Sequence, residues 1–553
     1  MAGLMVSCMG MEESDPSSLQ VPEVKTFEVK DNGSLVFELT ASVDKNLSGR
    51  IAECGFYYGK DKSMSGAEKV ECKMLGGSFF AEITLCEYGE TFYACSYISN
   101  GVEGNEICSD PKSVTVKELQ DYVEFGQAAH VSYDRATKAA SVSVSYEVEK
   151  GVDVTARGLC YGTSRELSVN GSTLNDKNLS SGSVTYEIPG VEAGKTYYVR
   201  PYLYDGEELA YGEPQELIIL DLSLVGSANC YIVSKSGSYY FPTFKGNSNE
   251  SVGAVKSVEV LWESFGTSTA PEVGDLIKSV SYSDCYITFQ TADTFKEGNA
   301  VIAANDASGK ILWSWHIWLT DEPGKCVYTN NAGTMMDRNL GATSANPGDV
   351  CALGLLYQWG RKDPFLGSSS INTSVEAMSS ITWPSPVESS SSCGTISYAI
   401  EHPTTFICGS SDNTSDWYYY GSSRTDNTRW QSTKTKYDPC PAGWRVPDGG
   451  SSGVWANSGF DDQNYDSINK GILFGAGISS PATWYPTSGS RWYGSGEITS
   501  WGVGEEGNYW SVTPYEDLDY AFAYQLYIFE TGGVSTTKWY HRAHGYSVRC
   551  IQE

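Results

Sequence analysis

The chain is long, acidic and rich in aromatic residues. Its 553 residues carry a formal net charge of −30, and 13% of them are Phe, Trp or Tyr. This length predicts about three to five domains. The acidic charge repels phosphate backbones and anionic lipid, which argues against nucleic-acid binding and against direct electrostatic binding to membranes. Abundant Gly, Ser, Thr and Tyr without helical periodicity predict mostly β structure.

The chain begins with a segment that resembles the end of a bacterial lipoprotein signal peptide. Its residues are Met1-Ala-Gly-Leu-Met-Val-Ser-Cys8, and the resemblance makes Cys8 the acylated residue. The basic and apolar regions that precede such a motif are missing, so Met1 is expected to be a mis-assigned start or an artificial boundary. The alternative is that Cys8 is an ordinary residue in a tail. No later stretch has the length of a spanning helix, so a lipid anchor is the only membrane attachment that the sequence predicts.

Residues 1–20 are expected to combine this signal remnant with a polar tether. The tether contains Met11-Glu-Glu-Ser-Asp15, which resembles the signals that send lipoproteins of Bacteroidetes to the cell surface. The odd total of 15 cysteines fits an oxidising compartment, with disulfides and one special thiol that we assign to Cys8. The predicted location is therefore the outer membrane, with a lipid anchor and the domains at the cell surface.

An internal repeat follows, with copies at residues 21–117 and 118–220. Two motifs of the first copy recur in the second in the same order and at nearly the same separation. They are Cys54-Gly-Phe-Tyr-Tyr-Gly59 with Gly89-Glu-Thr-Phe-Tyr-Ala-Cys95, and Arg157-Gly-Leu-Cys-Tyr-Gly162 with Gly194-Lys-Thr-Tyr-Tyr-Val-Arg200. The motifs resemble those of fibronectin type III-like modules in Bacteroidetes surface proteins, so each copy is expected to be a β-sandwich.

Strand alternation within the repeat predicts which side chains face each core. Inward positions are Phe92, Ala94, Ser96, Ile98, Tyr197, Val199, Pro201 and Leu203. Cys95 and Arg200 are then expected to face outward. Because Cys54 aligns with Arg157, we expect Cys54 and Cys95 on one face of neighbouring strands, either bridged or as two free thiols.

Residues 221–321 break the repeat but keep the strand alternation, for example at Val258, Val260 and Trp262. The motifs Ala228-Asn-Cys-Tyr-Ile-Val-Ser234 and Trp313-Ser-Trp-His-Ile-Trp318 are similar to those of surface and fimbria-associated proteins of Bacteroidetes. A third β-sandwich-like domain is therefore expected, docked tightly against the domain that follows it.

The last domain is predicted to span residues 322–553. Of the 15 tryptophans only Trp262 precedes Trp313, which marks a change in composition. Five motifs then follow in order: Met336-Asp-Arg-Asn-Leu-Gly-Ala-Thr343, Gly354-Leu-Leu-Tyr-Gln-Trp-Gly-Arg-Lys-Asp-Pro-Phe365, His402-Pro-Thr-Thr-Phe406, Asp438-Pro-Cys-Pro-Ala-Gly-Trp-Arg-Val-Pro447 and Gly545-Tyr-Ser-Val-Arg-Cys550. Together they resemble the Fibrobacter succinogenes major paralogous domain. That family implies an α+β, C-type lectin-like fold of the formylglycine-generating-enzyme type, which hosts both enzymes and binders.

The same resemblance implies a disulfide between Cys440 and Cys550, which would tie the final strand to the middle of the domain. Relatives with enzymatic activity hold copper with paired cysteines, but these two cysteines match the structural pair of the module. Among the five histidines only His541 and His544 are close in sequence, and no Cys or carboxylate motif completes a metal site there. We therefore expect no metal, no cofactor and no enzymatic activity.

A ligand face is predicted in the last fifty or so residues, since in lectin-like domains of this type the segment before the final strand binds the ligand. In some relatives, diversity-generating retroelements randomise that segment. Its mixture of aromatic, polar and charged side chains is typical of binding surfaces, although ordinary strand and hairpin residues are the alternative. The predicted ligand-binding residues are Tyr515, Asp517, Asp519, Tyr520, Trp539, Tyr540, His541, Arg542 and His544.

These features predict a monomeric cell-surface protein that recognises a protein or carbohydrate ligand on a host or bacterial surface. Adhesion, including a fimbria-associated role or a retroelement-diversified binder, is the first hypothesis. A glycan-binding accessory lipoprotein of polysaccharide uptake is the second, and a shallow aromatic platform would favour it. An oxidase-like enzyme of the formylglycine-generating fold is the third, and metal analysis of the purified protein would detect it.

Overall fold

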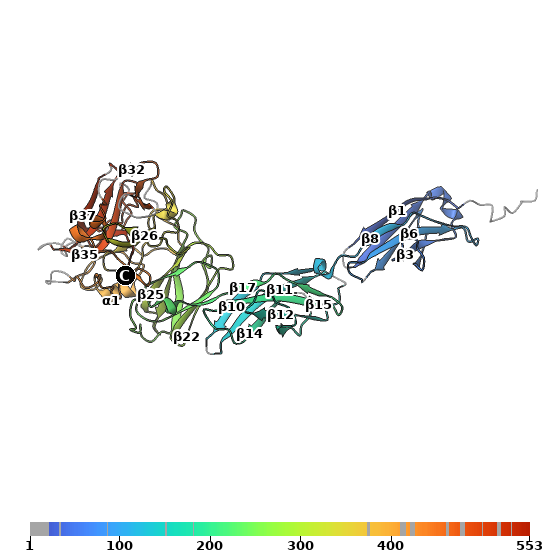
Figure 1. Ribbon diagram of the computed structural model, residues 1–553, viewed down its shortest axis with the longest axis horizontal. Coiled ribbons are helices and arrows are strands. Elements are labelled where there is room, and N and C mark those ends of the chain that lie inside the picture. The colour runs from blue at the N-terminus through green and yellow to red at the C-terminus, as the bar shows by residue number, and fades with distance from the viewer. Residues whose placement is uncertain are drawn as a thin grey trace, which may run out of the picture. The chain divides into compact units, whose positions relative to one another are not determined.

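The protein is mostly β, and strands occur in every part of the chain that the structure describes (Figure 1). The computed structural model describes residues 21–32, 35–85, 87–135, 137–149, 152–180, 182–372, 376–409, 416–420, 426–460, 464–475, 482–499, 502–516, 521–531 and 533–553. Cys8 lies outside these residues. No helix among them is long and apolar enough to cross a bilayer. The chain divides into two compact units, of which the first holds residues 1–129, 141–188 and 197–216 and the second holds the remainder.

The first copy of the repeat is a sandwich of two antiparallel sheets. One sheet has the order β1-β2-β5, and the other has the order β4-β3-β6-β7 with β8 also paired to β6. A core of Phe27, Phe37, Phe56 and Phe79 lies between them. The elements are β1 (Val24–Asp31), β2 (Val36–Val43), η2 (Lys45–Arg50), β3 (Glu53–Gly59), β4 (Glu68–Cys72), β5 (Ser78–Thr84), β6 (Thr91–Ser99), β7 (Glu106–Cys108) and β8 (Lys112–Thr115).

The second copy repeats this arrangement, with one sheet around β11 and β14 and another of order β13-β12-β15-β16. A glycine marks the same close contact in both copies. A Cβ on Gly55 would lie 2.0 Å from the Val70 oxygen, and one on Gly158 would lie 2.2 Å from the Leu174 oxygen. The elements are η3 (Leu119–Tyr122), β9 (Val123–Phe125), β10 (Ala129–Asp134), β11 (Ala139–Val148), β12 (Ala156–Gly162), β13 (Ser172–Asn175), β14 (Gly182–Ile188), β15 (Tyr197–Tyr204), β16 (Leu209–Tyr211) and β17 (Gln215–Leu217).

The expectation that Cys54 and Cys95 share one face of the sheet is wrong. In the β3–β6 pair, Cys54 is opposite Ile98 and Cys95 is opposite Tyr57. Cys54 therefore points into the core with Phe56, while Cys95 points to the other face with Tyr97. Cys95 is nevertheless only 1% exposed, because large neighbours on the outer face cover it.

The second unit contains two further four-stranded sheets, of order β18-β20-β23-β22 and β19-β25-β24-β21. Their apolar faces share a core that includes Tyr239, Phe241, Phe289, Trp313 and Trp315. The elements are β18 (Ile219–Asp221), η4 (Leu222–Val225), β19 (Cys230–Val233), β20 (Ser238–Pro242), β21 (Ser257–Ser264), β22 (Ile277–Ser283), β23 (Tyr286–Thr291), β24 (Gly298–Asn305) and β25 (Ile311–Leu319).

The remaining residues form small sheets joined by long loops. A five-stranded sheet of order β28-β38-β35-β36-β37 is accompanied by β26-β27-β39-β31, β32-β33-β34 and the pair β29-β30. The elements are β26 (Lys325–Tyr328), β27 (Gly333–Met336), η5 (Val350–Ala352), β28 (Leu356–Gln358), β29 (Val387–Glu388), α1 (Ile396–Glu401), β30 (Ile407–Cys408), β31 (Trp444–Arg445), η7 (Gly450–Ser452), α2 (Val454–Asn457), β32 (Tyr465–Asp466), β33 (Gly471–Phe474), β34 (Thr483–Pro486), β35 (Glu506–Glu516), β36 (Ala521–Phe529), β37 (Val534–His541), β38 (Gly545–Ser547) and β39 (Ile551–Gln552).

The β18–β25 sheets and the loop-rich region after them share a single hydrophobic cluster. Trp262 and Trp318 from the sheets pack in it with Leu340, Tyr357 and other residues of the loop-rich region. Hydrogen bonds cross the same boundary, since the indole nitrogen of Trp318 donates to the Ala342 oxygen at 3.1 Å. Burial of several large aromatic rings in one cluster makes this junction rigid.

A disulfide joins Cys440 to Cys550, with a Cα–Cα distance of 6.1 Å, as the family resemblance implied. The loop before it is ordered by Asp438, whose carboxylate accepts hydrogen bonds from the backbone nitrogens of Cys440 and Val446, both at 2.9 Å. Burial raises the pKa of Asp438 to about 6. The chain segment that follows Cys550 then pairs with β31, with Trp444 opposite Gln552.

Removing this disulfide should destabilise the second unit selectively. The sequence separation is 110 residues, so Cys550→Ser should lower the free energy of unfolding by about 2–5 kcal/mol. Denaturation followed by tryptophan fluorescence measures this, because all 15 tryptophans of the sequence lie in that unit. Cys160→Ser, which removes a buried free thiol from the first unit, is the matched control. Alkylation of both Cys440 and Cys550 in the unreduced native protein would contradict the bridge.

Candidate functional site

Strands β35, β36 and β37 carry aromatic side chains on one face of the five-stranded sheet. Tyr515 pairs with Phe522 across β35 and β36. Phe522 pairs with His541, and Tyr524 pairs with Trp539, across β36 and β37. Residues directly opposite each other share a face, and positions two apart on a strand also share it. We call these five residues the aromatic platform.

The rings of the aromatic platform are in direct contact. Tyr515 stacks on Trp539 with ring centroids 4.7 Å apart, and Phe522 lies 4.5 Å from Trp539. The same Phe522 ring lies 4.8 Å from His541, so it forms the centre of the cluster. Aromatic pairs at these separations stabilise each other beyond their buried area, which fixes the ring positions before any ligand binds.

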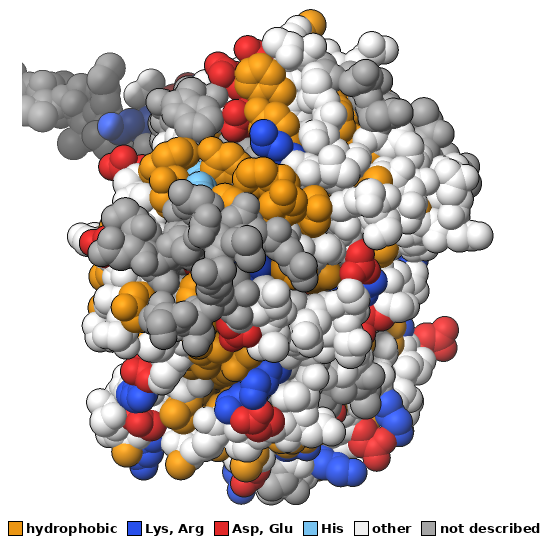
Figure 2. All heavy atoms as spheres, turned by 90° about the vertical axis from the view of Figure 1, so that its left-hand side faces the viewer, with side chains coloured by type: hydrophobic (Ala, Val, Ile, Leu, Met, Phe, Trp, Pro, Cys, Tyr) orange, Lys and Arg blue, Asp and Glu red, His pale blue; other side chains and the backbone are white. Residues whose placement is uncertain are grey.

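The platform is covered at its base and open at its rim. Phe522 is 5% exposed whereas Trp539 is 36% exposed. One side of the platform packs against η7, where a Cβ on Gly450 would lie 3.3 Å from the Tyr524 ring. Gly450 also has a positive φ of 75°. A glycine is therefore required there by both conformation and space. Figure 2 shows a face on which hydrophobic side chains gather around a histidine.

The aromatic platform is electrically neutral at physiological pH. Desolvation by burial lowers the pKa of His541 to about 4, so its imidazole carries no charge there. The other four members are uncharged aromatic side chains. The ring of Tyr493, from the loop after β34, lies 4.7 Å from His541 and extends the apolar area. Such a surface suits stacking and apolar contact rather than the attraction of ions.

The sequence-based ligand face is only partly correct. Tyr515, Trp539 and His541 come together as expected, but Tyr540 lies on the opposite face of β37, since it pairs with Ala523. Its ring packs against the core cluster and lies 4.8 Å from His544. Tyr540 is therefore a support of the sheet and not a member of the platform. Asp517, Asp519 and Tyr520 lie outside the described residues.

Arg542 was expected on the surface and is instead completely buried. Its Nε donates to the Phe522 oxygen at 2.9 Å, and one Nη donates to Asn427 Oδ1 at 2.7 Å. The guanidinium lies 4.2 Å from the centre of the Trp359 ring, and burial lowers the pKa of Arg542 to about 10. The chain turns inward after β37, so this side chain holds the platform strand β36 from below.

His544 is also buried, at 1% exposure, and does not contribute to the surface. Its ring lies among aromatic rings, 5.1 Å from Trp492 and 5.0 Å from Tyr546. Burial lowers the pKa of His544 well below its usual value. The reason is topological, because His544 precedes β38, which is a central strand of the same sheet.

Phe522 and Tyr524 belong to the platform but were not among the predicted ligand-binding residues. The signal that would have found them is the alternation Phe522, Tyr524 on β36 set against Trp539, His541 on β37. Pairing two alternating strands through the short connection between them predicts which aromatic side chains meet.

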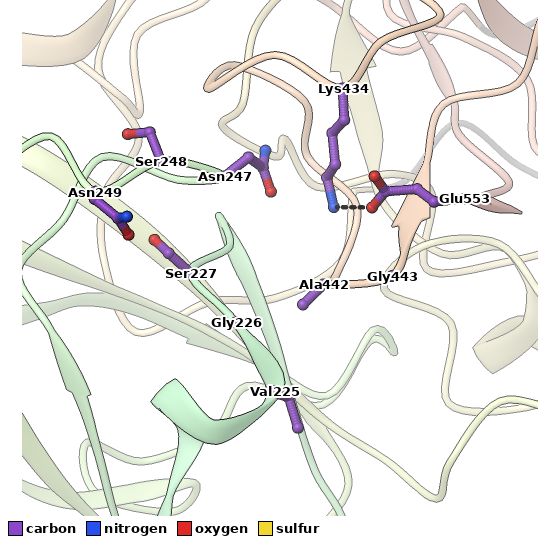
Figure 3. A pocket seen from close by; sticks show the side chains of 10 residues that line it. All are labelled: Val225, Gly226, Ser227, Asn247, Ser248, Asn249, Lys434, Ala442, Gly443 and Glu553. Carbon is purple, nitrogen blue, oxygen red and sulfur yellow. Dashed lines mark ion pairs between the residues drawn. The ribbon is translucent and has the colours of Figure 1, made fainter.

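A polar pocket with a volume of about 400 Å³ lies elsewhere in the second unit (Figure 3). Lys434 is the cation in its lining, and its Nζ lies 3.5 Å from the Glu553 carboxylate and donates to the Pro441 oxygen at 2.6 Å. Because this charge is already paired, the pocket is a weaker candidate than the platform. The lining residues are Val225, Gly226, Ser227, Asn247, Ser248, Asn249, Lys434, Ala442, Gly443 and Glu553.

Metal binding finds no support in the part of the chain that the structure describes. Within it, no three His, Cys, Asp or Glu side chains are grouped closely enough to hold an ion. The disulfide occupies Cys440 and Cys550, which also removes those two thiols as ligands.

Comparisons with known proteins give no family. No family model matches the chain, and no curated protein matches it. Among solved structures, the FN1–FN3 domains of chicken CNTN1 are similar at 9% identity and a TM-score of 0.19, covering 53% of this chain and 97% of that chain. The chicken interferon gamma receptor alpha chain is similar at 12% identity and a TM-score of 0.19, covering 36% and 98%.

Substitution should separate the support role of Arg542 from the surface role of Trp539. Arg542→Ala leaves buried carbonyls without donors and opens a cavity, so it should cost about 3 kcal/mol of unfolding free energy. Trp539→Ala removes a half-exposed ring and should cost about 1 kcal/mol. Urea unfolding of the two variants and wild type measures both. Equal stability of Arg542→Ala and wild type would show that the buried contacts are unimportant.

Proposed function

We propose that the protein recognises a ligand at a cell surface through the aromatic platform of its C-terminal region. The observation that carries this is the contiguous set of neutral rings at Tyr515, Phe522, Tyr524, Trp539 and His541, with Trp539 at the exposed rim. Large rigid aromatic side chains provide contact area at a low cost in conformational entropy. Binding without catalysis fits a surface built from five packed aromatic side chains.

The chemistry of the platform favours a ligand with flat apolar patches. The faces of sugar rings carry C–H groups that stack on Trp and Tyr, and apolar side chains of a protein partner meet the same surface. A charged ligand would gain little, because His541 is neutral. The resemblance of residues 322–553 to C-type lectin-like domains also supports this proposal, since domains of that fold bind ligands at comparable surfaces.

The proposal has two forms, which differ in whether the ligand is a protein or a glycan. Adhesion to a protein is the first form, including a fimbria-associated role. The parallel stack of Tyr515 on Trp539, with planes 21° apart, favours the second form, a glycan-binding accessory of polysaccharide uptake. The stack uses one face of each ring, and the exposed part of Trp539 remains available to a sugar ring.

Replacement of the rim tryptophan tests the binding site. Trp539→Ala should weaken ligand binding by roughly 1–4 kcal/mol, because a Trp at the rim of a rigid cluster is a typical hot spot. A glycan array and a screen against surface proteins identify the ligand, and titration then measures the affinity of each variant. Phe80→Ala is the matched control, since Phe80 is an exposed aromatic residue (61%) in β5 of the first unit.

The outcomes are distinguishable. Loss of binding in Trp539→Ala with retained binding in Phe80→Ala supports the platform. Equal binding of both variants places the ligand elsewhere and contradicts the proposed site.

Because His541 stays neutral, affinity should also be constant between about pH 5 and pH 8.

The surface location is proposed from the N-terminal motif alone. If Cys8 is acylated, the protein expressed with a complete lipoprotein leader should fractionate with membranes, and Cys8→Ser should release it. Fractionation followed by immunodetection measures this, with Cys160→Ser as a control that keeps the anchor. Membrane retention of Cys8→Ser would contradict lipidation at this residue.

A further inference from the structure

Four cysteines of the first sandwich are arranged as two cross-strand pairs. Cys54 on β3 lies directly opposite Cys72 on β4. Cys95 on β6 lies on the same face as Cys108 on β7, because Cys108 pairs with Tyr97, two residues further along β6. All four are thiols in this structure. The two pairs lie on opposite faces of one sheet and are independent of each other.

The first pair has the spacing that a disulfide requires. Residues directly opposite in an antiparallel pair have Cα atoms about 4.5–5.5 Å apart, within the disulfide range of about 4.4–6.8 Å. The Cys54 Sγ approaches the backbone oxygen of Cys72 to 3.3 Å. Cys54 is buried in the core, and Cys72 is partly buried against the same cluster.

The second pair joins a buried thiol to an exposed one. Cys95 is 1% exposed, whereas Cys108 is exposed. The interaction between the two thiols raises the pKa of Cys95 and lowers the pKa of Cys108. Both side chains lie on one face of the sheet, at diagonal positions on neighbouring strands.

The second sandwich supplies an internal comparison for the first pair. Gly158, the counterpart of Gly55, is opposite Asn175, so Arg157 and Asp176 occupy the positions of Cys54 and Cys72. These two residues form an ion pair, with Arg157 Nη2 2.7 Å from Asp176 Oδ2 and the arginine side chain 2% exposed. One copy thus places a charge pair where the other places two cysteines.

The second pair has a counterpart of the same kind. Tyr202 is opposite Tyr211 as Tyr97 is opposite Cys108, so Arg200 and Tyr211 occupy the positions of Cys95 and Cys108. The Arg200 guanidinium lies 4.5 Å from the centre of the Tyr211 ring, which is a cation–π contact. At both positions the second sandwich therefore uses two residues that contact each other across the strands.

We propose that the first sandwich carries two structural disulfides, Cys54–Cys72 and Cys95–Cys108, formed when the chain meets an oxidising compartment. Each replaces, by a covalent bond, a cross-strand contact that the second sandwich makes with a charged side chain. The proposal does not depend on the ligand or on the aromatic platform.

A disulfide such as oxidised glutathione is a sufficient oxidant for each bond. The accessible thiolate, Cys108 in one pair and Cys72 in the other, attacks a sulfur of the oxidant and releases one glutathione thiolate. The buried partner, Cys95 or Cys54, then loses its proton to water and attacks the mixed disulfide, releasing the second glutathione. Two protein thiols lose two electrons in total, and one glutathione disulfide is reduced to two thiols.

Peptide mapping of the full chain tests the pairing. The purified protein is equilibrated with oxidised glutathione, its free thiols are alkylated, and it is digested without reduction. Linked peptides are expected for Cys54 with Cys72 and for Cys95 with Cys108. Cys160, buried in the second sandwich, should be recovered as an alkylated thiol. Cys108→Ser should free Cys95 and leave the other link intact.

Other patterns overturn the proposal. Alkylation of all four cysteines after oxidation shows that the pairs do not form disulfides. A link between Cys54 and Cys95, or from any of the four to Cys86, shows that the cross-strand pairing is wrong. Mapping uses the unsubstituted protein, so the result stands even if a cysteine variant fails to fold.

Discussion

The C-terminal region depends on buried arginine side chains that satisfy the backbone of its loops. Arg361 is 2% exposed, and its guanidinium donates to the oxygens of Thr405 and His402 at 2.9 and 3.3 Å. Loops lack the ladder partners of a sheet, and each buried carbonyl without a donor costs about 1–3 kcal/mol. A planar guanidinium offers five N–H donors in a fixed fork and so reaches several carbonyls at once, whereas a lysine ammonium has three donors. Arg491, Arg542 and Arg549 act in the same way.

Aromatic rings of this region lie against several of the same arginines. The two flat faces of a buried guanidinium cannot donate hydrogen bonds, but they can make cation–π contacts with aromatic rings. Arg549 lies 3.7 Å from the centre of the Tyr485 ring, and Arg429, which pairs with the buried Asp416, lies 5.0 Å from Trp359. Each of these buried guanidinium groups therefore has an aromatic ring beside it as well as a polar partner.

Much of the fold followed from the sequence, but less of the site did. Alternation correctly predicted the buried positions of β6, such as Phe92 and Ile98, because strand period decides burial. Arg542 was assigned to the surface, since arginine is common at binding hot spots and in buried loop networks alike. Only the three-dimensional structure shows which of these two roles an arginine has. The prediction that Cys54 and Cys95 share one face of the sheet was wrong. It treated Arg157, which aligns with Cys54, as an outward residue, whereas the Arg157 side chain is buried.

The strand alternation beneath the aromatic platform also separates two kinds of evolutionary constraint. Tyr515, Trp539 and His541 point to one side of the sheet, while Ala523 and Tyr540 point to the other and pack against the core. Substitutions on the outer side change the shape offered to a ligand and leave the inner packing untouched. The outer side of the sheet can thus acquire new specificities at a small cost in unfolding free energy, provided that Phe522 still packs against the neighbouring rings.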